Sequence, residues 1–234
     1  MNVSRLRFFQ KYLYILVHLK GLIKGFKHPH YSQWGEDVVV ENILRKVKKG
    51  FYVDVGAYHP MHYSNTFRLY KRGWRGINIE PNPSAKLLFS LHRPHDVHVT
   101  GGVAVETKTC PYYVFNHQSC NTFSEEQKEH MMQKSYIQLV DTKQIRCEPL
   151  RDTIARHASE KHINFLNIDV EGQNFEVLQT LNWDTHAPNV ICIEDDDFVI
   201  DSDTQHGSKI FSFLHERGYR LVAHVGLSYI YERN

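Results

Sequence analysis

Two acidic residues mark points where the sequence changes from strand-forming to turn-forming residues. Asp54 lies at the end of the apolar run 50–55, and Glu80 closes the run 76–80. Short apolar runs of this kind predict β-strands, and the segment between them is long enough for one helix. In an open α/β sheet, ligands bind at the carboxyl ends of the strands. We therefore expect Asp54 and Glu80 at a binding edge, with Gly56 letting the backbone approach a ligand.

The charge of the first loop indicates which cofactor it accepts. A dinucleotide needs a glycine-rich loop whose amides hold the pyrophosphate, but this loop has only Gly56 and follows a carboxylate. That carboxylate would repel a phosphate and can bind, directly or through water, the ammonium of an amino-acid group. S-adenosylmethionine (SAM) has an ammonium, a ribose and no phosphate, so SAM is favoured over NAD. Glu80 is placed for the ribose hydroxyls, and the same two loops offer Ala57, Tyr58 and Asn82 as further cofactor contacts.

Methyl transfer to a hydroxyl requires alignment of two substrates and removal of a proton. Asp169 and Glu171 are candidate bases because they close the apolar run 163–170, and residues two apart on a strand share a face. Alternatively, one of them caps the next helix. His59, with His62 three residues later, titrates near neutral pH and is a third candidate. Its alternative role is that of a loop histidine bonded to backbone.

Three further polar groups have open assignments. Ser64, Asn65 and Thr66 precede a predicted helix and suit either caps or an anionic group such as the methionine carboxylate. The acidic run 194–197 invites a divalent metal, since hard cations bind carboxylates, but consecutive acids are also typical of a solvated loop. Pro94 would break any helix that aligned His92, His95 and His98. No residue is assigned as a metal ligand.

Several of these segments together resemble the FkbM-type methyltransferase family, a branch of the SAM-dependent enzymes. The resemblance covers roughly residues 31–200 and depends on YSQWGED (31–37), FYVDVGA (51–57), SNT (64–66), RGWRGINIEPNP (72–83), NIDVEG (167–172) and EVL (176–178). The sequence departs from the family at His59-Pro60, where many relatives have an Asn-x-Gly-like turn. The resemblance implies that Gln33, Glu36 and Asp37 fold over the cofactor.

The order of predicted elements indicates an α/β fold. Strands are predicted at 50–55, 76–80, 96–105, 112–115, 163–170, 189–194, 219–224 and 227–232, and helices at 38–44, 64–72, 83–91, 148–157, 175–181 and 210–217. Alternating strands and helices with a final hairpin predict a mostly parallel sheet with an antiparallel edge strand. The resemblance implies the Rossmann-like fold of class I SAM-dependent methyltransferases, with seven strands in the order 3-2-1-4-5-7-6. Residues 31–234 form this domain, and the long polar stretch 116–145 is a candidate lid or substrate insertion.

The first 30 residues differ in composition from the rest. Residues 1–35 hold six Lys or Arg and no acid, whereas the remainder has 22 basic and 26 acidic residues, which gives no nucleic-acid signature. The segment 5–27 is too interrupted by charge to span a bilayer, which takes about 20 apolar residues. It predicts a basic amphipathic helix that contacts an anionic membrane, or else packs on the domain or a second subunit. Four cysteines without a CxxC pair favour a reducing, cytoplasmic location, at most peripheral at the inner face of a membrane.

The function predicted from these features is a SAM-dependent O-methyltransferase. The resemblance implies a hydroxyl acceptor on a sugar or polysaccharide, such as a lipid-linked glycan or lipopolysaccharide, or on a secondary metabolite. One alternative is a non-catalytic binding or scaffold protein that keeps the fold, and intact acids at 54, 80, 169 and 171 speak against it. Another is an NAD-linked oxidoreductase, which the missing phosphate glycines disfavour.

Overall fold

A computed structural model describes residues 30–195 and 208–234. Two predicted features lie outside the described residues: the helix over residues 5–27 and the last two acids of the run 194–197. The membrane contact of that helix stays a prediction, as does the cytoplasmic location. None of the helices within the described ranges is long and apolar enough to cross a membrane.

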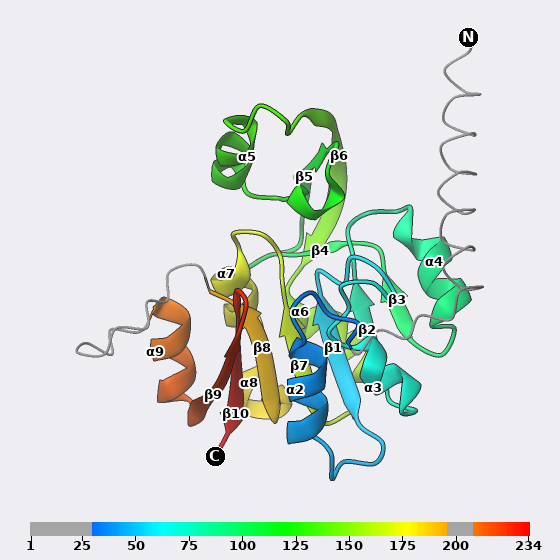
Figure 1. Ribbon diagram of the computed structural model, residues 1–234, viewed down its shortest axis with the longest axis vertical. Coiled ribbons are helices and arrows are strands. Elements are labelled where there is room, and N and C mark those ends of the chain that lie inside the picture. The colour runs from blue at the N-terminus through cyan, green and yellow to red at the C-terminus, as the bar shows by residue number, and fades with distance from the viewer. Residues whose placement is uncertain (1–29, 196–207) are drawn as a thin grey trace.

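A seven-stranded sheet forms the centre of the molecule (Figure 1). Its strands are β1 (Phe51–Val55), β2 (Arg75–Ile79), β3 (Val97–Val99), β7 (Phe165–Ile168), β8 (Val190–Glu194), β9 (Tyr219–Val225) and β10 (Ser228–Arg233). Their order is β3-β2-β1-β7-β8-β10-β9, and β10 runs antiparallel to both of its neighbours. The predicted order 3-2-1-4-5-7-6 is therefore confirmed, with β7 and β8 as fourth and fifth strands.

Helices cover both faces of this sheet because alternate strand residues point to opposite sides. On one side, Tyr52 and Phe165 pack with residues of α2 (Glu36–Ile43) and α3 (Phe67–Lys71). On the other, Val53 and Leu166 pack with α6 (Leu150–Ala158), α7 (Asn174–Gln179) and α9 (Lys209–Glu216). The remaining helices are α4 (Ala85–His92), whose Phe89 packs on Ala57, and the short α8 (Trp183–His186). This three-layer arrangement leaves the carboxyl ends of the strands open to ligands.

A second, three-stranded sheet stands above the carboxyl edge of the first (Figure 1). It contains β4 (Gly102–Val103), β5 (Lys108–Phe115) and β6 (Leu139–Glu148), in the order β4-β6-β5. The connection from β5 to β6 holds the 3-10 helix η1 (Gln118–Cys120) and α5 (Glu125–Met132). We call residues 108–148 the insertion.

This second sheet corrects two predictions. The single strand predicted at 96–105 is two strands, β3 and β4, in different sheets, because the chain turns at Thr100 and Gly101. The stretch 116–145, a candidate lid or insertion to which no helix or strand was assigned, contains η1, α5 and most of β6. The outer half of β6 is exposed on both faces, so its sequence lacks the alternation that identifies a strand.

Two element boundaries near the binding edge also differ from prediction. The strand predicted to reach residue 170 ends at Ile168, after which the backbone turns and the Val170 amide donates to Asn174 Oδ1 over 2.9 Å. Asp169 and Glu171 therefore do not lie on a continuing strand. Helix α2 starts at Glu36, two residues before the predicted start, and the hydroxyl of Ser32 accepts bonds from the amides of Gly35 and Asp37.

Candidate active site

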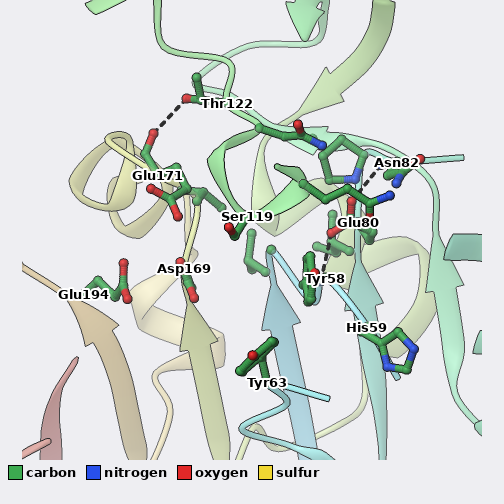
Figure 2. Close-up of a pocket in the computed structure, with 18 of the residues that line it drawn as sticks. Tyr58, His59, Tyr63, Glu80, Asn82, Ser119, Thr122, Asp169, Glu171 and Glu194 are labelled. Carbon is green, nitrogen blue, oxygen red and sulfur yellow. Dashed lines mark hydrogen bonds between the residues drawn. The ribbon is translucent and has the colours of Figure 1, made fainter. Parts of the chain in front are cut away.

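A cavity of about 970 Å³ opens at the carboxyl ends of β1, β2, β7 and β8. The insertion covers it from above, and Figure 2 shows Ser119 and Thr122 of that segment over the ends of the strands. Thr122 Oγ1 donates a 2.8 Å hydrogen bond to the carbonyl oxygen of Glu171 in the loop after β7. The cavity thus lies between the two sheets, and a partly buried hydrogen bond joins the insertion to the loop after β7.

Most of the predicted site residues lie on this cavity. Those that line it are Gln33, Gly56, Tyr58, His59, Asn65, Glu80, Asn82, Asp169 and Glu171. Those that the structure places outside its lining are Asp37, Asp54, Ala57, Ser64 and Thr66. Most of the residues outside the lining form hydrogen bonds that hold the strand ends and loops in place, as described below.

Glu80 lies at the end of β2 and faces the cavity, as expected (Figure 2). Its Oε2 accepts the Tyr58 amide over 2.9 Å and its Oε1 accepts the Asn82 amide over 2.8 Å. Each carboxylate oxygen keeps a second lone pair for a ligand hydroxyl. Burial raises the pKa of Glu80 to about 7, while the two amide bonds oppose this shift. The geometry suits recognition of a pair of adjacent hydroxyls.

Gly56 brings the first loop against the loop after β7. Its backbone has φ +79°, and a Cβ built at this position would lie 1.7 Å from the carbonyl oxygen of Asp169. The amides of Gly56 and Ala57 donate to the Ile79 carbonyl, which also fixes this loop to β2. The floor of the cavity is therefore bare backbone, which only glycine permits.

If the cavity binds SAM, as the sequence predicts, Gly56→Ala should abolish this binding, because the new methyl group would force the β1 and β7 loops apart. The clash is with backbone, so no side-chain rotation relieves it. Isothermal titration calorimetry should show a loss of more than about 100-fold, equivalent to about 2.7 kcal/mol. Gly73→Ala is the matched control, since its φ is also positive but nothing lies within 4 Å of the new atom. Unchanged affinity in Gly56→Ala would contradict the placement of the cofactor floor.

Three carboxylates gather on the opposite side of the cavity from Glu80 (Figure 2). They are Asp169 and Glu171 after β7 and Glu194 at the end of β8. Burial raises the pKa of Asp169 well above its usual range, and the charges of Glu194 and Glu171 add to the shift. A carboxylate with such a raised pKa is a better proton acceptor near neutral pH.

Backbone strain also concentrates at this cavity. The non-glycine residues with positive φ in the described ranges are Tyr58, Tyr63 and Glu171, at 50°, 53° and 49°. All three line the cavity. Conformations of this kind cost free energy and cluster where a fold holds functional groups in place. The presence of all three at one cavity indicates a functional site, and this evidence is independent of the sequence motifs.

Asp54 corrects the expected ammonium site. It shares a strand face with Tyr52 and points toward α3, beneath the cavity. Its Oδ2 accepts the Thr66 hydroxyl over 2.5 Å and its Oδ1 accepts the Asn167 amide over 2.9 Å. Burial raises the pKa of Asp54, and Arg93 and these two donors oppose that shift. The carboxylate organises the site from below and does not line the cavity.

Other predicted residues also have structural contacts. Asp37 accepts bonds from Ser32 Oγ, the Tyr31 amide and Arg68 Nε, which fixes the segment before α2 to α3. Ser64 Oγ accepts the Phe67 amide over 3.1 Å and so acts as a cap. His59 lines the cavity, and its Nδ1 accepts the amides of residues 61 and 62. These are the contacts of a loop histidine bonded to backbone, and its catalytic role stays a prediction.

The insertion supplies eight lining residues that sequence reasoning missed. Its contributions are Tyr112, Asn116, His117, Gln118, Ser119, Asn121, Thr122 and Phe123. The length and polarity of the segment were the available signal, but they did not identify individual residues. Glu194 was also missed, because the acidic run containing it has the composition of a solvated loop.

The cavity is strongly acidic. Its carboxylates are Glu36, Glu80, Asp169, Glu171 and Glu194, and its described lining holds no Lys or Arg. Such a surface attracts a cation and repels a pyrophosphate. Within residues 30–195 and 208–234, no group of three or more His, Cys, Asp or Glu has an arrangement that could hold a metal ion.

The sheet order, with one antiparallel strand near its edge, and the cavity at the strand ends define a Rossmann-like methyltransferase fold. The profile of the FkbM methyltransferase domain matches residues 54–221, and the chain therefore belongs to this family of methyltransferases. A comparison with curated proteins gave no match. Among 10 matching solved chains is a crystal structure from Klebsiella pneumoniae provisionally named an O-methyltransferase. Its TM-score is 0.44 at 8% identity, and the match covers 88% of this chain and 83% of that chain.

Proposed function

We propose that this methyltransferase uses SAM and transfers its methyl group to a hydroxyl oxygen. The acceptor we propose is a sugar or polysaccharide, such as a lipid-linked glycan or lipopolysaccharide, or a secondary metabolite. The observation that carries the cofactor assignment is Glu80, whose buried carboxylate faces the cavity across Gly56 from Asp169. Family membership supports the class of reaction.

The residues of the cavity fit SAM better than they fit a dinucleotide. SAM bears a sulfonium and an ammonium against one carboxylate, so its net charge is positive, and it supplies an activated methyl group. The acidic lining favours such a cation, whereas NAD would bring two phosphates among these carboxylates. The volume of about 970 Å³ lies within the range of about 300–1,000 Å³ usual for cofactor sites and leaves space for an acceptor.

Each part of the lining has a distinct role in this proposal. Glu80 accepts the ribose hydroxyls, and Gly56 lets the cofactor lie on the backbone. Asp169 receives the proton of the acceptor hydroxyl, because its pKa is raised and it lies beside the cofactor floor. Glu171 is the alternative base. The insertion excludes water and positions the acceptor.

The proposed hydroxyl-rich acceptor is supported by the chemistry of the insertion. Amide, hydroxyl and imidazole groups of Asn116, His117, Gln118 and Ser119 line its side of the cavity. Such groups both donate and accept hydrogen bonds, as sugar hydroxyls require. Tyr63 adds an aromatic ring that is 63% exposed at the cavity. This combination of an apolar ring with polar neighbours matches the two faces of a sugar.

Titration calorimetry with SAM, S-adenosylhomocysteine and NAD tests the proposal. We expect the first two ligands to bind and Glu80→Ala to weaken both, because two charge-assisted hydrogen bonds are lost. Each such bond is worth about 1.5–3 kcal/mol, so the loss of two predicts at least about 100-fold weaker binding. Preference for NAD would instead support the oxidoreductase alternative. Tight SAM binding without turnover on any hydroxylated acceptor would support the scaffold alternative.

The pH dependence of binding provides a second test of Glu80. The pKa of about 7 means that much of this group is protonated in the free protein below neutral pH. Ribose hydroxyls donate to the ionised form, so affinity for S-adenosylhomocysteine should rise by about 10-fold from pH 6 to pH 8. Glu80→Gln should bind more weakly and remove this rise. An equal pH slope in both proteins would rule out Glu80 as the titrating contact.

A further inference from the structure

A chain of buried hydrogen bonds runs from Arg93 to the wall of the cavity. Arg93 Nη1 donates to Thr66 Oγ1 over 3.0 Å, and this hydroxyl donates in turn to Asp54 Oδ2. On the other side, Asn167 Nδ2 donates to Asp54 Oδ1, and Asn65 Nδ2 donates to Asn167 Oδ1 over 2.8 Å. All five side chains are at most 9% exposed.

The direction of every bond in this chain is fixed by the chemistry of its members. Arginine can only donate, so the Thr66 hydroxyl must direct its proton to Asp54. The Asp54 carboxylate can only accept when ionised, which requires Asn167 to present its NH₂ group. The oxygen of Asn167 then faces Asn65, which must also present its NH₂ group. Reversing the Asn65 amide would place two oxygens in contact.

This orientation leaves one polar atom of Asn65 for a ligand. Both of its N–H groups are used, one by Asn167 and one by the sulfur of Cys192 at 3.9 Å. Asn65 lines the cavity, and within the described residues its Oδ1 accepts no hydrogen bond. The side chain thus offers an acceptor without a donor. This orientation favours a cationic ligand over the anionic group that the sequence also allows at Asn65.

The position of Asn65 indicates which part of the cofactor it meets. Its partners Asn167 and Cys192 are on β7 and β8, whereas Glu80 follows β2, on the other side of β1. A ligand whose ribose lies at Glu80 and which crosses Gly56 has its far end at Asn65. In SAM that end is the amino-acid group, of which only the ammonium can donate.

Building on the proposed function, we infer that Asn65 Oδ1 binds the α-ammonium group of the methyl donor. Asn167 and Asp54 are positioning residues that keep the Asn65 amide in its accepting orientation. The sequence predicts that the Asp54 carboxylate binds the ammonium. In this inference the neutral Asn65 oxygen binds it, and Asp54 acts indirectly by orienting the side-chain amides of Asn167 and Asn65. The ligand feature selected here is an alkylammonium cation.

Two adenosine ligands test this inference by calorimetry on the full chain. S-Adenosylhomocysteine has the amino-acid group, and 5′-methylthioadenosine lacks it. Wild-type protein should prefer the former, and Asn65→Ala should reduce this preference by about 10- to 100-fold, as expected for a charge-assisted hydrogen bond. Its affinity for 5′-methylthioadenosine should be unchanged, which also shows that the variant is folded. Asn82→Ala, at the ribose end, is the control and should weaken both ligands equally.

The outcomes separate the inference from the proposed function. If wild-type protein binds both ligands and Asn65→Ala keeps the full preference, the ammonium site is wrong and the SAM assignment stands. An equal loss of preference in Asn65→Ala and Asn82→Ala would overturn the inference in the same way. If wild-type protein binds neither ligand, the proposed function fails and the inference falls with it.

Discussion

Replacing Arg93 with methionine should lower the free energy of unfolding by about 3–5 kcal/mol, the usual cost of removing one partner from a buried ion pair. Arg93 is 1% exposed, and its Nε lies 2.8 Å from Asp96 Oδ2. Its other nitrogens donate to Tyr52, Thr66 and Ser64. Methionine fills much of the same volume but leaves two buried carboxylates, Asp54 and Asp96, without their cation.

Thermal and urea unfolding would measure this loss. For a domain of this size, about 3–5 kcal/mol corresponds to a fall in Tm of roughly 6–20 °C. Arg220→Met is the control, because the Arg220–Glu232 pair is on the surface and its removal should cost less than about 1 kcal/mol. The difference between wild type and Arg93→Met should narrow as pH falls, since protonation relieves the unpaired carboxylates. Similar stabilities for the two variants at neutral pH would refute a buried ion pair.

The largest effect on turnover is expected for Asp169→Asn. If Asp169 is the proton acceptor, its amide analogue should lower the rate of methyl transfer by about 10²–10⁴-fold. The change is nearly isosteric, so affinity for S-adenosylhomocysteine should stay within a few-fold of wild type. Transfer from methyl-labelled SAM, with the hydroxylated acceptor that wild type uses best in a glycan panel, would measure the rate.

The pH profile distinguishes a base from a merely structural carboxylate. The raised pKa of Asp169 places the rise in rate with pH at a higher pH than for an ordinary carboxyl group. The asparagine variant should lose this rise. Asp184→Asn on α8, outside the lining of the cavity, is the matched control and should retain wild-type rates. A small loss in Asp169→Asn and a large one in Glu171→Gln would assign the base to Glu171.

Much of the central sheet could be predicted from sequence because each strand is a short apolar run that ends in a polar turn. That pattern placed Gly56 and Glu80 at the ligand-binding edge, where the structure has them. Strand order is different, since it depends on contacts between distant segments. The predicted order came from the family resemblance, and the structure confirms it.

The rest of the site depends on interactions that local patterns do not contain. Asp54 is displaced from the cavity by strand alternation and by the donors Thr66 and Asn167, which come from separate elements. Arg93 lies in a polar stretch that predicts exposure, yet tertiary contacts bury it completely. Because the outer half of β6 is exposed, its sequence has no strand pattern, and the second sheet could not be predicted. The residues of the insertion that cover the cavity were therefore not identified either.

The close approach of Gly56 to the Asp169 carbonyl has a consequence for how this methyltransferase could evolve to use new acceptors. Backbone atoms alone set the spacing between the first loop and the start of the β7 loop. The insertion is joined to the loop after β7 by the bond from Thr122 to the Glu171 carbonyl oxygen, and its Ser124 and Gln127 lie beside Gly172. If the insertion positions the acceptor as proposed, changes in its lining residues should alter which acceptor is used, provided that glycine at 56 and a hydroxyl at 122 are kept.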